Sequence, residues 1–246
     1  MSVKYSLLMP FHKRAQQLAV TLSSFLHLYR RNDYEILIGE DYKNMMDQIE
    51  HLALVKVLGN FSPVLNIQTI ITGTSDCWNP STAFNELARR AQGRFLVITN
   101  PECLHETNVL EGLDQAFEQN PDQYVVCACR IPTRQWYQHS VHRSVKVHFC
   151  SALSKEMYNR IGGFDEEYSK GVCFEDDDFR NTILSNDIRI VERDDLVVMH
   201  QAHSKSKPAD YAKLHVVNKR YFDRKWGSKA FRAERLTVEP FQSKSG

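Results

Sequence analysis

The chain has 246 residues, of which 42% are hydrophobic and 25% charged, a composition typical of a soluble globular protein with one large α/β domain or a domain and a small appendage. The formal net charge of +1 argues against a nucleic-acid partner held by bulk electrostatics. No apolar run approaches the roughly 20 residues that span a bilayer, and the N-terminus lacks a signal-peptide core, so we expect a soluble, cytoplasmic protein. The six cysteines show no Cys-x-x-Cys spacing, which predicts free thiols rather than a zinc ribbon or a disulfide framework.

The N-terminal residues predict a strand, a helix and a second strand. Residues 5–9 are a short apolar run, residues 18–29 carry apolar side chains at helical spacing, and residues 34–38 are again β-type. This order opens a βαβ unit and predicts a parallel sheet. Ligands collect at the carboxyl ends of such strands, where Arg14 follows the first strand and Glu40-Asp41 follows the second.

The next predicted elements are a helix at residues 45–58, a strand at residues 66–71 and a helix over residues 84–91. Asn79 and Ser81 are each a candidate N-cap of the last of these helices. Asn85 lies inside the helix, where asparagine is intrinsically unfavourable, so it is a candidate functional residue.

A fourth strand is predicted at residues 95–99 and runs directly into Asn100-Pro101-Glu102. A carboxylate at the end of a buried strand suits Mg²⁺ or Mn²⁺, because these cations prefer oxygen ligands. A loop turn centred on Pro101 is the equally open alternative.

The second half of the chain alternates in the same way. Its predicted elements are a helix at 108–120, a strand at 124–129, an irregular aromatic and basic stretch at 131–145, a lead into the next helix at 145–150, and short strands at 188–191 and 196–200. The irregular stretch fits either a loop that contacts a sugar-like ligand or an ordinary surface loop. The last strand leaves His200 and His203 at its end.

Residues 162–180 place two glycines and four consecutive carboxylates beside apolar side chains. Buried carboxylates are costly unless a positive or reactive group lies opposite, so this cluster predicts a functional partner. The alternative is that Glu175 to Asp178 only open a helix, in which acidic side chains complement the helix dipole and Arg180 lies four residues after Asp176.

From Lys205 the chain is basic, and apolar side chains over residues 211–221 predict an amphipathic helix that begins near Pro208. The interspersed lysine and arginine side chains indicate contact with a membrane surface or an anionic acceptor. A helix packed on the domain with a charged outer face is the alternative.

These signals occur in an order that resembles the inverting nucleotide-sugar glycosyltransferases of family 2, which have the GT-A fold. The strongest match is Gly162-Gly163-Phe164-Asp165-Glu166 followed by Glu175-Asp176-Asp177-Asp178-Phe179, a stretch that also resembles the C-terminal motif of galactosyltransferases. Weaker matches are residues 8–14, Asn79, Ala83, Asn85 and Gly93. The resemblance implies an α/β fold with a mixed, mainly parallel sheet flanked by helices. It implies a GT-A domain at 1–204, with a nucleotide-binding half at 1–102 and an acceptor and catalytic half at 103–204, followed by a basic helical extension at 205–246.

The resemblance also implies roles for individual residues. The residues that would hold the nucleotide base and ribose are Pro10, Phe11, Arg14, Glu40 and Asp41, and those along the nucleotide-sugar cleft are Asn79, Asn85, Asn100 and Gly163. Glu102 would be the surviving carboxylate of the family's Asp-x-Asp metal motif, with His200 as a second metal ligand and His203 in reserve. Asp176 would be the catalytic base, with Glu175 beside it.

By resemblance, the chain transfers a sugar with inversion from a nucleotide diphosphate sugar, UDP-linked by family expectation, to a hydroxyl of a glycan or glycolipid in surface polysaccharide biosynthesis. Its cofactor would be Mn²⁺ or Mg²⁺, although Asn100 replaces the first acid of the metal motif, and its C-terminal segment would place it at the inner face of the membrane. The alternatives are an inactive nucleotide-sugar-binding module and one half of a bifunctional polymerising system. A Rossmann dehydrogenase is disfavoured because no Gly-x-Gly-x-x-Gly follows the first strand.

Overall fold

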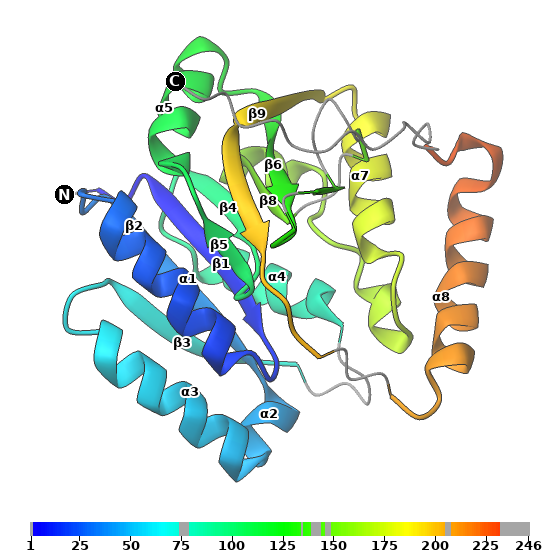
Figure 1. Cartoon of the computed structure of the whole chain (residues 1–246). Coiled ribbons are helices and arrows are strands. Elements are labelled where there is room, and N and C mark those ends of the chain that lie inside the picture. The colour runs from blue at the N-terminus through cyan, green and yellow to red at the C-terminus, as the bar shows by residue number, and fades with distance from the viewer. Residues whose placement is uncertain are drawn as a thin grey trace.

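The computed structural model describes residues 2–73, 79–133, 135–138, 144–145, 149–204 and 208–231. Over these residues, one nine-stranded sheet runs through the molecule with helices on both faces (Figure 1). The strands, in their order across the sheet, are β3 (Ile67–Thr72), β2 (Tyr34–Asp41), β1 (Tyr5–Phe11), β4 (Phe95–Thr99), β8 (Cys150–Ser154), β6 (Gln123–Arg130), β9 (Arg189–His200) and β5 (Cys103–His105), and β7 (Trp136–Gln138) pairs with β6. The helices are α1 (Ala15–Leu28), α2 (Tyr42–Met46), α3 (Gln48–Phe61), α4 (Pro80–Arg90), α5 (Val109–Gln119), α6 (Lys155–Arg160), α7 (Glu175–Ser185) and α8 (Tyr211–Trp226), with 3-10 turns η1 (Glu166–Lys170) and η2 (Gly227–Lys229).

The first half of the sheet is parallel, as the βαβ pattern predicts. β1 pairs in parallel with β2 and β4, and β2 pairs in parallel with β3. Every residue of β1 and β2 is buried, because helices cover both faces of these strands. All four strands end on the same side of the molecule, the carboxyl end of the sheet.

The second half of the sheet is mixed and differs from the sequence predictions in three ways. β8 is a strand antiparallel to β4 and β6, where the sequence predicts only a lead into a helix. β9 is one strand of 12 residues rather than two, because its pairing with β6 resumes after a register shift between Cys127 and Ala128. β5 and β7 have three residues each, too few to show a period in the sequence.

Two hydrophobic clusters lie on the two faces of the sheet. α1, α3 and α5 contribute to one cluster, and α4, α6 and α7 contribute to the other. Neighbouring residues of β1 point to opposite faces, so Leu7 belongs to the first cluster and Leu8 to the second. This three-layer arrangement confirms the predicted α/β class with helices on both sides of a mixed sheet.

α8 stands at the side of the molecule beside α7 (Figure 1). The predicted C-terminal helix is confirmed and begins at Tyr211. Its buried side chains are Asn218 and Phe222, and its lysine and arginine side chains are exposed, so it packs on the body with a charged outer face. Among the described residues, no helix is long and apolar enough to cross a bilayer.

Candidate active site

The carboxyl end of the sheet brings together residues that are far apart in the sequence. Asn79 caps α4 there, because its side chain accepts a hydrogen bond of 3.0 Å from the backbone N–H of Ser81. Its Nδ2 also donates to Oε2 of Glu175 at 3.3 Å. The cap predicted from the sequence is therefore present, and the same side chain joins the start of α4 to the start of α7.

Glu102, His200 and His203 form a compact group, the Glu-His-His group, at this end of the sheet. Oε1 of Glu102 lies 3.9 Å from Nε2 of His200 and 3.9 Å from Nε2 of His203. The three ligand atoms all lie within 4.8 Å of one another, a separation at which one cation can contact all three. The structure thus brings the two predicted metal ligands and the reserve histidine to one place.

Backbone pairing and side-chain packing hold the Glu-His-His group. Cys103 pairs with His200 across β5 and β9, and the N–H of Gln201 donates to the carbonyl of Glu102 at 2.9 Å. The rings of Tyr137 and Phe149 have centroids 5.0 and 5.1 Å from that of His200. The side chains of Glu102, His200 and His203 remain 15%, 13% and 10% exposed, so a ligand can reach them.

Glu175 and Asp176, the acid pair, open α7 and are half-buried. Burial raises the pKa of Glu175, and the neighbouring charge of Asp176 raises it further. Burial likewise raises the pKa of Asp176, with a contribution from Asp177, while Arg180 opposes the shift. A carboxylate with a raised pKa is a stronger proton acceptor, as a general base near neutral pH requires.

The other two carboxylates of the acidic run have structural partners. Asp177 pairs with Arg180, three residues later, at 2.8 Å. Asp178 is 1% exposed and accepts hydrogen bonds from the hydroxyl of Tyr168 at 3.0 Å and from Nε1 of Trp226 at 2.7 Å. These contacts give Asp177 and Asp178 structural roles.

Gly162 and Gly163 form a tight turn with φ of +86° and +68°, a conformation that favours glycine. A Cβ on Gly163 would lie 2.5 Å from Oδ1 of Asn85, which accepts hydrogen bonds from the N–H of Phe164 and the hydroxyl of Tyr158. Nδ2 of Asn85 donates to the carbonyl of Phe164 at 2.8 Å. Gly163 thus approaches Asn85 and Tyr158 closely, and Asn85 holds this turn from inside α4. Their proposed place along the nucleotide-sugar cleft stays a prediction.

The residues predicted to hold the nucleotide differ in how accessible they are. The side chain of Phe11 is buried in the first hydrophobic cluster, and the buried carboxylate of Glu40 accepts from Nδ2 of Asn44 at 2.8 Å and contacts Nδ1 of His51 at 3.0 Å. These contacts give both side chains structural roles, and nucleotide binding by Phe11 and Glu40 stays a prediction.

Among the other residues predicted for the nucleotide sugar, Asp41 is buried, whereas Arg14 and Asn100 are half-buried. Asp41 ends β2, and its Oδ2 lies 3.1 Å from Nδ1 of His12. Arg14 is half-buried and donates to the carbonyl of Lys13 at 2.8 Å, and Asn100 is half-buried in the turn after β4. His12 is absent from the sequence predictions, although its place directly after the first strand is a signal that could have found it.

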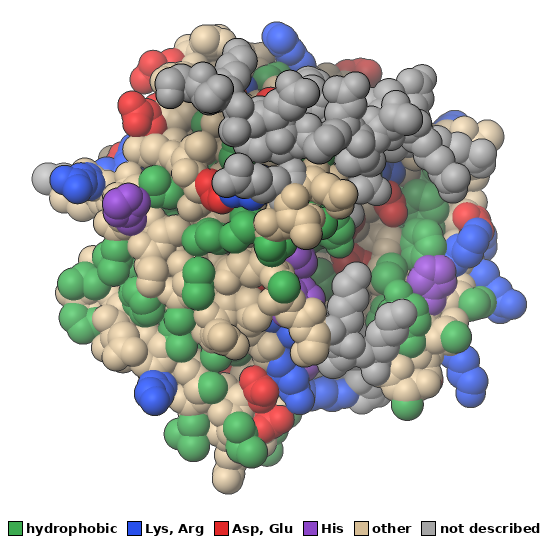
Figure 2. All heavy atoms as spheres, viewed as in Figure 1, with side chains coloured by type: hydrophobic (Ala, Val, Ile, Leu, Met, Phe, Trp, Pro, Cys, Tyr) green, Lys and Arg blue, Asp and Glu red, His purple; other side chains and the backbone are tan. Residues whose placement is uncertain are grey.

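Figure 2 shows a hollow on this face between the middle of the molecule and the side where α8 stands, with histidine on both walls and acidic side chains in its depth. Residues 6–173 match the family described as Glycosyl transferase family 2. The chain belongs to this family. The match ends at residue 173, just before Glu175, so it does not cover the acid pair. No curated protein sequence matches the chain.

Solved structures share the fold of this chain at low sequence identity. S. aureus TarS 1–349 in complex with UDP-GlcNAc has a TM-score of 0.64 and 14% identity, over 87% of this chain and 65% of TarS 1–349. The mannosyltransferase PcManGT from Pyrobaculum calidifontis, in complex with GDP-Man and Mn²⁺, has a TM-score of 0.62 and 15% identity, over 95% of this chain and 66% of its own. The transferase thus has the GT-A fold and spans less than two thirds of the length of these proteins.

Proposed function

We propose that this transferase moves a sugar, with inversion, from a nucleoside diphosphate sugar to a hydroxyl of a glycan or glycolipid acceptor. The observation that carries the proposal is the presence of the Glu-His-His group and the acid pair at one end of the sheet, where α/β proteins bind ligands. The Glu-His-His group suits the departing diphosphate, and the acid pair suits the attacking hydroxyl.

Asp176 is the proposed general base. Its carboxylate takes the proton of the acceptor hydroxyl, whose oxygen attacks the anomeric carbon while the bond from that carbon to the diphosphate oxygen breaks and the nucleoside diphosphate leaves. Glu175, held by Nδ2 of Asn79, orients the acceptor or the sugar. The raised pKa of Asp176 supports its assignment as base.

The Glu-His-His group has the donor set of a divalent-cation site. Two imidazoles and one carboxylate suit Mn²⁺ better than Mg²⁺, which prefers oxygen ligands alone. When bound, the cation supplies positive charge opposite the leaving diphosphate. The two histidines offset the acid that Asn100 replaces in the metal motif, so we propose that Glu102, His200 and His203 hold Mn²⁺ together.

The donor proposal is a UDP-sugar. TarS is solved with UDP-GlcNAc, which supports uridine, whereas PcManGT is solved with GDP-Man, so both bases belong in the test. We assign Asp41, with His12 beside it, and Arg14 to the base and ribose, because they follow β1 and β2 at the carboxyl end. Asn79 and Asn100 line the path from there to the acid pair.

We further propose peripheral contact with the inner face of the membrane through α8, in the service of surface polysaccharide assembly. Lys213, Lys219, Arg220 and Arg224 are exposed on this helix together with Val216 and Val217, which are 43% and 45% exposed. Basic and apolar side chains on one exposed helix favour binding to anionic lipid. Sedimentation with vesicles of anionic and of neutral lipid tests this, and equal binding to both would contradict it.

A panel of UDP- and GDP-sugars, with Mn²⁺, with Mg²⁺ and with a chelator, tests the catalytic proposal through hydrolysis and thermal stabilisation. We expect one nucleotide sugar to raise the melting temperature and to be hydrolysed slowly in Mn²⁺. Binding without any turnover would favour an inactive nucleotide-sugar-binding module. Failure of the folded protein to bind any nucleotide would contradict the donor site.

A further inference from the structure

The segment that leads into the acid pair, residues 171–174, has an unusual backbone. Cys173 and Phe174 have φ of +66° and +74°, in the left-handed region that non-glycine residues rarely adopt. Phe174 is the N-cap of α7 and directly precedes Glu175. Such a conformation persists where the surrounding structure over-determines it, so other residues must hold this lead-in segment.

Asn218 of α8 joins the lead-in segment to η1. It is 1% exposed, and its Nδ2 donates to the backbone carbonyl of Tyr168 in η1 at 2.9 Å and to that of Cys173 at 2.9 Å. One buried amide group therefore fixes the residue before Phe174 relative to η1. The carbonyl of Tyr168 also accepts from the N–H of Gly171, so the loss of Asn218 acts on the lead-in segment through the carbonyl of Cys173.

Packing against α8 holds the middle of the lead-in segment. A Cβ on Gly171 would lie 2.4 Å from the carbonyl oxygen of Leu214 and 2.5 Å from Oδ1 of Asn218, so the backbone runs directly against the helix. The ring of Phe174 packs against His215 and Phe222, with centroid distances of 5.0 and 5.4 Å. Each residue with positive φ therefore contacts α8 or is held by it.

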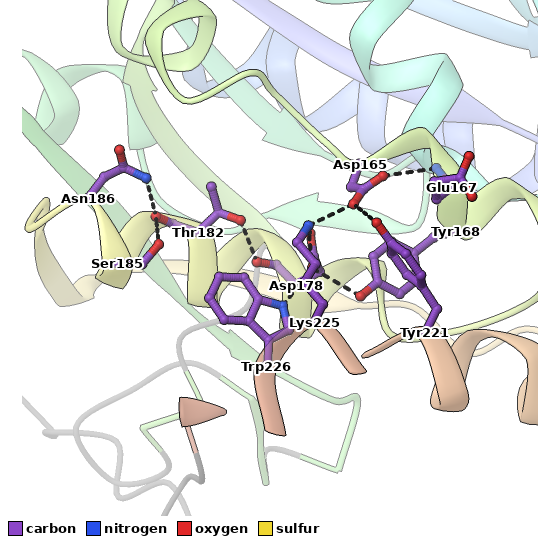
Figure 3. Close-up of polar contacts among 10 residues, drawn as sticks. All are labelled: Asp165, Glu167, Tyr168, Asp178, Thr182, Ser185, Asn186, Tyr221, Lys225 and Trp226. Atoms are coloured by element: carbon purple, nitrogen blue, oxygen red, sulfur yellow. Dashed lines mark hydrogen bonds and ion pairs between the residues drawn. The ribbon is translucent and has the colours of Figure 1, made fainter. Parts of the chain in front are cut away.

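α8 is anchored to the body at a second place. Nζ of Lys225 lies between Oδ2 of Asp165 at 2.7 Å and the carboxylate of Asp178 at 2.9 Å, and the hydroxyl of Tyr221 donates to Asp165 at 2.8 Å (Figure 3). Nε1 of Trp226, the residue after Lys225, also donates to Asp178. These contacts hold the last turns of α8 independently of the lead-in segment. The position of α8 therefore does not depend on the conformation of that segment.

We propose that α8 is a positioning element of the catalytic site and that Asn218 is its positioning residue. By holding the lead-in segment, with Cys173 and Phe174 in the left-handed conformation, Asn218 directs Glu175 and Asp176 toward the acceptor. The inference rests on the proposed function, because it concerns the residue that we assign as the base. It makes the transfer step dependent on α8, while the donor and metal residues are held by other elements.

The first test needs no substrate. Cys173 is exposed, whereas the other described cysteines are buried, so its rate of reaction with iodoacetamide, followed by peptide mass spectrometry, reports on the lead-in segment. In Asn218→Ala we expect the labelling of Cys173 to be faster by about tenfold, because the segment opens locally more often. Asn218→Asp, which keeps the volume and loses the donor, should act in the same direction.

The second test separates positioning from general stability. We expect Asn218→Ala to lower kcat for transfer by roughly 10- to 100-fold while KM for the nucleotide sugar stays unchanged. Tyr221→Phe is the matched control, because it removes one hydrogen bond between α8 and Asp165 and leaves the contacts of Asn218 in place. It should lower the melting temperature and leave both the labelling of Cys173 and kcat at the wild-type level.

Gly171→Ala provides a second variant, which keeps Asn218 and pushes the segment away from Leu214. If Asn218→Ala does not fold, Gly171→Ala carries both tests. Labelling and kcat within about twofold of wild type in the folded variants would overturn the inference. Full transfer activity in Asp176→Asn would instead overturn the assignment of the base, and it would leave the labelling result intact.

Discussion

The two sides of the candidate site are built in different ways. The Glu-His-His group lies at the ends of β4 and β9, and strand pairing between β5 and β9 fixes it within the sheet. The acid pair lies at the end of a segment with two residues of positive φ, and contacts with α8 hold that segment. The proposed donor side is therefore part of the sheet, whereas the proposed acceptor side depends on α8, which follows it in the chain. Donor binding and sugar transfer should therefore fail separately.

The largest expected effect comes from Asp176→Asn. If Asp176 is the base, the variant loses transfer activity by roughly 10³-fold, because general base catalysis contributes about 10²- to 10⁴-fold. Nucleotide binding, measured by calorimetry, should stay at the wild-type level. Asp177→Asn is the matched control, since this carboxylate is 42% exposed and pairs with Arg180. Near-normal transfer by Asp176→Asn would contradict the assignment of Asp176 as the general base.

Variants of the Glu-His-His group test the donor side. We expect Glu102→Gln and His200→Ala to weaken Mn²⁺ binding by about 100-fold or more, because each removes one of three ligands. His27→Ala, an exposed histidine in the last turn of α1, is the matched control. Calorimetric titration with Mn²⁺ and then with Mg²⁺ measures the effect. Unchanged Mn²⁺ affinity in both variants would place the cation elsewhere.

The pH dependence of stability sharpens the contrast. The raised pKa of Glu175 means that the folded protein keeps a proton that the unfolded chain has already lost, so this group lowers stability as pH rises from the ordinary carboxyl pKa through the raised one. Glu175→Gln should therefore raise the melting temperature at about pH 8.5 and change it little at about pH 4. Glu86→Gln should instead lower the melting temperature at about pH 8.5. Hydrogen bonds from Arg89 and Arg90 lower the pKa of Glu86, so this carboxylate stabilises the folded state when the pH is above the pKa of an ordinary glutamate. The same shift for both variants would contradict the burial of the acid pair.

The smallest expected effects concern the turn beside the acid pair. Gly163→Ala should destabilise the protein by about 3 kcal/mol, because the φ is positive and the new Cβ meets Asn85 and Tyr158. Gly162→Ala has the same backbone strain but no atom within 4 Å of the new Cβ, so we expect about 1 kcal/mol. Chemical denaturation measures both. Equal losses would show that the contact with Asn85 contributes nothing.

Local patterns predict the parts of this molecule that are set by local forces. Most strands and helices of the first half follow from periodicity, although the one helix predicted at 45–58 is two helices, α2 and α3. Glu102 is indicated by its place shortly after the buried strand β4, and His200 by the family resemblance. β8 could not be found, since its place between β4 and β6 depends on pairing with residues far away in the chain. The roles of Asn79 toward Glu175 and of Asn218 toward Cys173 join residues 96 and 45 positions apart, and no spacing rule predicts such contacts.

Asn85 and Phe11 show what a sequence pattern leaves open. The amide of Asn85, inside α4, is hydrogen bonded to the neighbouring turn. Phe11 ends β1 at the carboxyl end of the sheet, and its side chain lies in the first hydrophobic cluster. In both cases the direction of the side chain depends on packing, which the sequence pattern does not show.

The contact of Asp178 with α8 affects the order in which the parts of the site can form during synthesis of the chain. His203 is the last of the proposed donor-side residues in the chain. Trp226, which donates a hydrogen bond to Asp178, is synthesised 23 residues after it (226 − 203). In this interval the residues that we assign to the donor side are already part of the chain, whereas the end of α8, which anchors the helix that holds the segment before Glu175, is still to be made.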